Sequence, residues 1–173
     1  MAEAINSHGR NALKETTMVE TKTISELSSL AEQLNSQSNN LNRYIKALND
    51  QLAALNIGLE FWDPTPIESS GLRYDSSYSP QRKFEEDVYL GYCKLEETWQ
   101  LAIKTTVTDY VWNDDNREED AVSEDEYAPL LKASRDIRLE ATERFDSFLA
   151  NLVEHTKRKL ASLQRAEQLA KLK

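Results

Sequence analysis

Residues 24–55 read ISELSSLAEQLNSQSNNLNRYIKALNDQLAAL, and apolar side chains recur in them in alternating steps of three and four. In heptad notation every d position is Leu, and the a positions are apolar except for Ser38. Such spacing keeps one seam of a helix against a partner helix, so it predicts a long coiled-coil helix over residues 21–56. The predicted seam consists of Ile24, Leu27, Leu34, Leu41, Ile45, Leu48, Leu52 and Leu55.

The flanks of this seam carry few charges. Their e and g positions are mostly Ser, Asn, Gln, Leu and Tyr, where charge-selected coiled coils place Glu and Lys. Residues 36–40, which read SQSNN, have poor helix propensity. The helix therefore needs packing against another surface to be stable.

Size and composition favour one domain with a core, since 39% of the 173 residues are hydrophobic and 29% are charged. The formal charge of −9 disfavours nucleic acid and anionic membranes as partners, because Lys and Arg supply phosphate affinity. A single Cys93 fits a reducing compartment. No apolar run approaches the roughly 20 residues that span a bilayer, and the N-terminus lacks a signal-peptide pattern. We therefore expect a cytoplasmic protein without a membrane partner.

The segment after Gly58 changes from helical period to alternation, and residues 57–112 are predicted to form a small β module. Its clearest part is a hairpin of residues 88–95 and 98–107, joined by a turn at Glu96–Glu97. Two Glu are unusual at such a turn, which favours Asn and Gly, so its register stays open. A long Pro- and Ser-rich loop is expected over residues 63–83, and loops of that length are often functional.

Three further segments complete the expected organisation. Residues 1–20 show no sustained period and are predicted to be a flexible arm, and the dense acidic charge of residues 113–126 predicts a solvated linker. A second apolar stripe, with a looser heptad fit, predicts a long helix over residues 127–173. The expected fold class is mainly α (α+β): two long helices, forming an antiparallel helical hairpin or coiled coil, with a small antiparallel β module inserted between them.

Few residues are candidates for chemistry. Cys93 has no second Cys, and His155 has Glu154 beside it in sequence but on a different helix face, so neither predicts a catalytic pair. The acidic run of residues 114–120 lacks the Gly of a calcium-binding loop. Phosphate-binding, hydrolase and zinc motifs are missing. We expect no enzyme activity, no catalytic residue, no cofactor, no bound metal and no small-molecule substrate, although an enzyme of unrecognised type is an alternative.

Two groups of residues are candidates for binding. The aromatic side chains of the β module either fill its core or form a groove for a protein partner, and the named candidates are Phe61, Trp62, Tyr92, Trp99 and Trp112. Basic residues on the C-terminal helix are either a solvated face or a phosphate-binding surface, and they are Lys157, Arg158, Arg165 and Lys171. The leading functional hypothesis is an assembly or adaptor subunit that self-associates or binds a protein. The alternative is a nucleic-acid-associated regulator.

Overall fold

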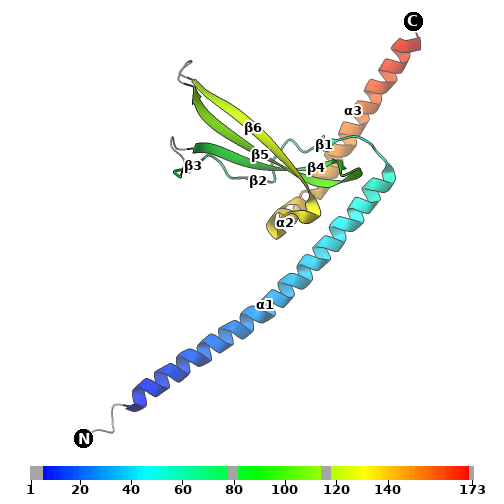
Figure 1. The fold of residues 1–173 in the computed structure, drawn as a ribbon. Coiled ribbons are helices and arrows are strands. Elements are labelled where there is room, and N and C mark those ends of the chain that lie inside the picture. Colours follow the sequence, from blue (N-terminus) through cyan, green and yellow to red (C-terminus); the bar gives the residue numbers. More distant parts are fainter. Residues whose placement is uncertain (1–5, 78–81, 114–117, 172–173) are drawn as a thin grey trace. The chain divides into compact units, whose positions relative to one another are not determined.

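The computed structural model describes the backbone of residues 6–77, 82–113 and 118–171 and the side chains of residues 22–77, 83–110 and 121–171. Its interactions divide the chain into two units, Met1–Asn42 and Arg43–Lys173, and each is described by itself. The elements appear in Figure 1 and are α1 (Asn6–Leu55), β1 (Phe61–Trp62), β2 (Glu68–Ser69), β3 (Arg73–Asp75), β4 (Arg82–Leu95), β5 (Thr98–Asn113), β6 (Glu118–Pro129), a 3-10 turn (Leu130–Lys132), α2 (Arg135–Glu143) and α3 (Phe145–Lys171).

The sheet of the second unit is antiparallel throughout the described strands. β4 and β5 lie at its centre, and β6 pairs with β5 along the far side. β1, β2 and β3 follow one another along the other side of β4, with Phe61 opposite Tyr92 and Arg73 opposite Phe84. The sheet is thus a meander: the three short strands β1, β2 and β3 form one edge, and β4, β5 and β6 follow in sequence order.

The predicted hairpin and its turn are confirmed. Leu95 pairs with Thr98, so Glu96 and Glu97 are the two turn residues, with φ of 48° and 67°. Positive φ at both positions is the geometry of a type I′ turn, which matches the twist of the flanking strands. The strands are longer than predicted because β5 continues to Asn113.

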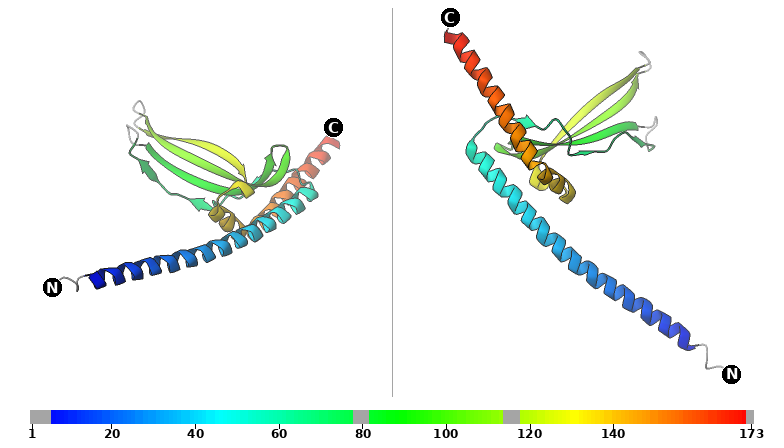
Figure 2. Two further views of the ribbon diagram at one scale, coloured as in Figure 1. Left: turned by 60° about the horizontal axis from the view of Figure 1, so that its bottom comes forward. Right: turned by 180° about the vertical axis from the view of Figure 1, so that it is seen from behind.

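The core of this unit lies between one face of the sheet and the helices. Alternate residues Leu90 and Tyr92 of β4 and Leu101 of β5 are almost fully buried there. Tyr92 and Leu101 form hydrogen bonds with the C-terminal end of α1, and Phe61 of β1 contacts Phe148 of α3. Ile45 of α1 and Phe145 and Phe148 of α3 are also almost fully buried. Figure 2 shows α2 and the start of α3 on one face of the sheet.

The predicted fold class is wrong. The chain has one long N-terminal helix, a six-stranded antiparallel sheet and a C-terminal helix, in place of two long helices with a small β insert. About 31% of the described residues are in strands. Most of the predicted acidic linker is a strand, because β6 begins at Glu118. Its polar side chains have partners on β5: Thr106 donates to Asp125 at 2.6 Å, and the Thr108 and Ser123 hydroxyls lie 2.9 Å apart. These cross-strand pairs offset the repulsion between the acidic residues.

The predicted C-terminal helix is also shorter than expected. Tyr127 belongs to β6, which ends at Pro129, and Ser134 is the N-cap of α2, where its hydroxyl accepts a hydrogen bond from the Ile137 amide at 3.2 Å. A break at Arg144, whose φ and ψ are −99° and −2°, separates α2 from α3.

The N-terminal and loop predictions differ as well. α1 begins at Asn6, so it includes most of the segment expected to be an arm. The segment expected to be a loop, residues 63–83, contains β2, β3 and the first residues of β4, while residues 78–81 lie outside the described part.

Candidate interaction site

The predicted seam of α1 divides into an exposed part and a buried part. Within the first unit, the side chains of Ile24, Leu27 and Leu34 are 66%, 59% and 52% exposed. We call these three residues the N-terminal seam. They keep the heptad register of the residues that follow, so the same row of one helix changes its environment along its length.

The C-terminal part of the seam packs within the second unit. Ile45 and Leu52 are buried, Leu48 is half-buried, and Leu55 is exposed at the helix end. The Asn49 side chain accepts a hydrogen bond from the Leu101 amide at 2.6 Å. The last residue of β5 that pairs with β6 is Ala102, and Leu101 lies next to it, where β6 has ended. Asn49 of α1 therefore accepts the hydrogen bond that β6 does not provide at this position. Leu41, the remaining seam residue, is half-buried.

The candidate aromatic residues do not form one surface. Phe61 and Tyr92 are buried on the helix-facing side of the sheet, where Phe61 contacts Phe148 with ring centroids 5.5 Å apart. Trp99 stacks on Tyr92, also at 5.5 Å, and is half-buried. Trp62 lies on the opposite face because it follows Phe61 in one strand. The side chain of Trp112 lies outside the described residues.

A cluster that the sequence did not reveal surrounds Trp62 on that opposite face. The Trp62 and Tyr127 rings lie 5.5 Å apart, and the ammonium of Lys104 lies 5.8 Å from the Trp62 centroid and 5.0 Å from that of Tyr89. Lys104 also pairs with Asp125 at 3.9 Å. Finding this cluster requires the strand register, which places Lys104 opposite both Tyr89 and Tyr127.

The charged and polar groups of this cluster interact with one another, as the pKa shifts of Asp125 and Tyr127 show. The hydrogen bond from the Thr106 hydroxyl lowers the pKa of Asp125, and the charge of Lys104 lowers it further by a smaller amount. Together they outweigh the partial desolvation of the carboxyl, which raises it. Burial, and then Asp125, raise the pKa of the Tyr127 phenol. Trp62 covers Gly91, whose missing side chain leaves the space for the indole. The cluster therefore has a structural role on the outer face of the sheet.

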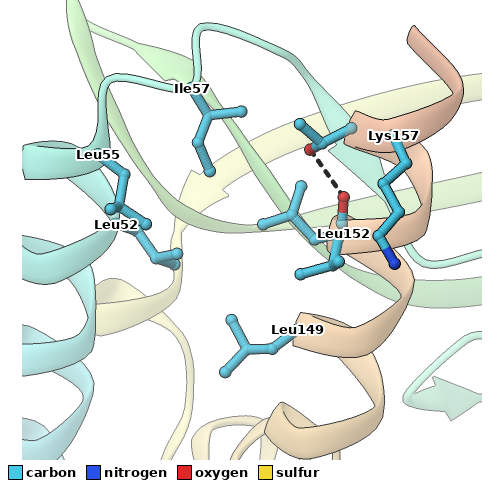
Figure 3. Close-up of a pocket in the computed structure, with 8 residues that line it drawn as sticks. Leu52, Leu55, Ile57, Leu149, Leu152 and Lys157 are labelled. Carbon is cyan, nitrogen blue, oxygen red and sulfur yellow. Dashed lines mark hydrogen bonds between the residues drawn. The ribbon is translucent and has the colours of Figure 1, made fainter. Parts of the chain in front are cut away.

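An apolar groove of about 290 Å³ lies between the C-terminal end of α1 and α3 (Figure 3). It is lined by Leu52, Leu55, Ile57, Leu149, Leu152, Val153, Thr156 and Lys157. Its one hydroxyl is engaged, because Thr156 donates to the Leu152 carbonyl at 2.8 Å. This lining accepts apolar side chains rather than a polar ligand.

The candidate phosphate-binding residues lie along α3 and are all exposed. Two of them have acidic partners on the same helix: Lys157 pairs with Glu154 at 2.7 Å, and Lys171 with Glu167 at 2.5 Å. Arg158 makes a long hydrogen bond to the Glu154 carbonyl, at 3.4 Å. Because Glu154 and Glu167 neutralise two of the four basic residues, the net positive charge of this surface of α3 is reduced.

Cys93 and His155, the two candidates for a catalytic role, lie in apolar surroundings. Burial, with a smaller effect of Glu60, raises the pKa of Cys93 to about 11, which keeps it a thiol at neutral pH. The imidazole of His155 lies 5.2 Å from the Phe61 ring, and burial, then Lys159 and Arg158, lower its pKa. Among the residues that the structure describes, no three His, Cys, Asp or Glu side chains are grouped to hold a metal ion. Within the same residues, no helix is both long and apolar enough to cross a bilayer.

Comparison with protein families, with curated proteins and with solved structures finds no match to this chain.

Proposed function

We propose that this protein is a non-enzymatic assembly subunit that associates with a second copy of itself through the N-terminal seam of α1. The proposal depends on one observation: Ile24, Leu27 and Leu34 are more than half exposed although they continue the heptad register of buried residues. A regular apolar row on an amphipathic helix is stabilised in water when another helix covers it.

The positions that flank the N-terminal seam favour a second copy as that other helix. They are Ser28, Leu30, Asn35 and Gln37, none of which carries a charge. In a parallel coiled coil the e positions of one helix face the g positions of the other. Two identical helices can therefore meet here without repulsion between like charges.

Sedimentation velocity of the full chain over a range of concentrations tests this proposal. The informative variant is Leu27→Asp/Leu34→Asp, which puts two carboxylates into the seam at exposed positions. Its matched control is Ser29→Asp/Ser36→Asp, which adds the same charges seven residues apart on the outer side of the helix. We expect wild type and control to sediment as a dimer and the seam variant as a monomer, because a carboxylate is expensive to bury in a helix interface.

Two results would contradict the proposal. Wild-type protein that stays monomeric at the highest soluble concentration would rule out self-association. Equal dimerisation of the seam variant and wild type would rule out the seam as the interface. Near-UV circular dichroism of each variant checks that the second unit keeps its packing.

A further inference from the structure

We infer that the groove between α1 and α3 is a docking site for an acidic amphipathic helix of another protein. The floor of the groove is well defined, because Leu52 and Leu152 are buried while Leu55 and Val153 are exposed at its rim. With the Thr156 hydroxyl bonded to its own helix, the groove is suited to inserted Leu-, Ile- or Met-like side chains.

The groove continues into an apolar row along α3, which points to a helix as the occupant. At about 100° per residue, Leu160 and Leu163 lie on the same side of α3 as Leu149, Leu152 and Thr156. Both leucines are exposed. From Leu149 to Leu163 the row is about 21 Å long, which matches roughly four turns of a partner helix. Anchors spaced three and four residues apart are the pattern of helix-in-groove recognition.

The basic residues beside this apolar row favour a partner helix that is negatively charged. Residues 157–171 contain five basic residues and one acidic residue, in a chain whose formal charge is −9. Lys157 and Lys159 lie on opposite edges of the apolar row, at about 100° and about 60° from its centre. An acidic helix would place carboxylates against both, whereas the α3 of a second copy would bring the same positive charge and be disfavoured. The exposed Lys157–Glu154 pair is of the kind that contributes little energy, so Lys157 can exchange its partner.

Fluorescence anisotropy with two designed peptides tests the inference on the full chain. Both peptides are amphipathic helices with Leu at a and d; one has Glu at e and g, and the other has Lys there. The Leu27→Asp/Leu34→Asp background is used so that neither peptide pairs with the N-terminal seam. We expect the Glu peptide to bind and the Lys peptide to bind at least about tenfold more weakly, because charge pairs at the rim set the preference.

Three variants locate the binding. Val153→Asp, at an exposed rim position, should abolish binding of the Glu peptide. Lys157→Glu/Lys159→Glu should weaken it by about tenfold and improve binding of the Lys peptide. Arg158→Glu/Arg165→Glu makes the same change of charge on the far side of α3 and should leave the Glu peptide within about twofold of the background.

Each remaining outcome would overturn the inference. Equal binding of both peptides, or of neither, would remove the acidic helix as the occupant. Equal losses in the two charge-reversal variants would show that the attraction is not local to the groove. Loss of self-association on introducing Val153→Asp into the otherwise wild-type chain would assign the groove to a second copy.

Discussion

The hydroxyl of Tyr92 on β4 donates a hydrogen bond to the carbonyl of Leu52 in the last turn of α1, at 3.2 Å. The last four carbonyls of a helix have no partner within the helix. The sheet therefore supplies the partner for one of them and fixes the point at which α1 ends against the core.

Removal of this hydroxyl is the first test. We expect Tyr92→Phe to lower the free energy of unfolding by about 1–3 kcal/mol, because the Leu52 carbonyl remains buried without its donor. The matched control is Tyr74→Phe at an exposed position, which should change stability by less than about 0.5 kcal/mol. Urea unfolding of both variants measures the difference, and an unchanged midpoint for Tyr92→Phe would show that the hydrogen bond contributes nothing.

Gly91 is the second test, because its backbone lies directly beneath an indole ring. A Cβ at this position would lie 2.1 Å from Cε3 of Trp62. We expect Gly91→Ala to destabilise the fold by about 1–3 kcal/mol through overpacking and to shift the tryptophan fluorescence. In a Trp62→Leu background the same substitution should cost clearly less, since the ring that it meets is gone. Equal costs in the two backgrounds would mean that Trp62 does not set the requirement for glycine.

The third prediction compares two residues of one heptad row. Ile45 is fully buried, so Ile45→Ala should lower the free energy of unfolding by about 2–5 kcal/mol at every protein concentration. Leu34 is about half exposed within the first unit, so Leu34→Ala should change the free energy of unfolding of the dilute protein by less than about 1 kcal/mol. Denaturant melts at several concentrations separate the two. A cost at Leu34 as large as that at Ile45 in dilute protein would show that its own chain buries it.

Cys93 gives the fourth prediction. Because its pKa is raised from about 9 to about 11, the native thiolate at neutral pH is about a hundredfold rarer than in the unfolded chain. Iodoacetamide should therefore label the native protein at least a hundredfold more slowly than the urea-unfolded protein. Because the folded protein favours the protonated thiol, Cys93 contributes to the free energy of unfolding below pH 9, and this contribution is lost as the pH rises towards 11. Labelling at equal rates in both states would contradict the burial of Cys93.

Local patterns in the sequence predicted the elements whose partners are close along the chain. The hairpin could be predicted because Val88, Leu90 and Tyr92 alternate with their neighbours and the turn follows at once. The strand β6 could not, because its stability comes from pairing with Thr106 and Thr108, whose register a run of acidic residues does not reveal. Acidic residues before Tyr127 and a proline at position 129 are typical of a helix start, which is why the sequence predicts a helix where β6 continues to Pro129.

The candidate site was predicted in part. The heptad row is evident from the sequence, but the burial of Ile45 is not, because it depends on packing within the second unit that a local period does not report. The aromatic residues were recognised as a group, yet register alone puts Phe61 and Trp62 on opposite faces. The groove joins residues about 100 positions apart, such as Leu52 and Leu152, and no local period reports such a contact.

β6 lies at the end of the strand order, with residues 121–127 exposed. An open strand edge is a template on which identical chains can add and grow into fibrils. Glu124 and Glu126 make that addition unfavourable at neutral pH, because every incoming copy would bring the same carboxylates against them. Without these two charges, the exposed edge of β6 would be open to the addition of further strands and so to aggregation.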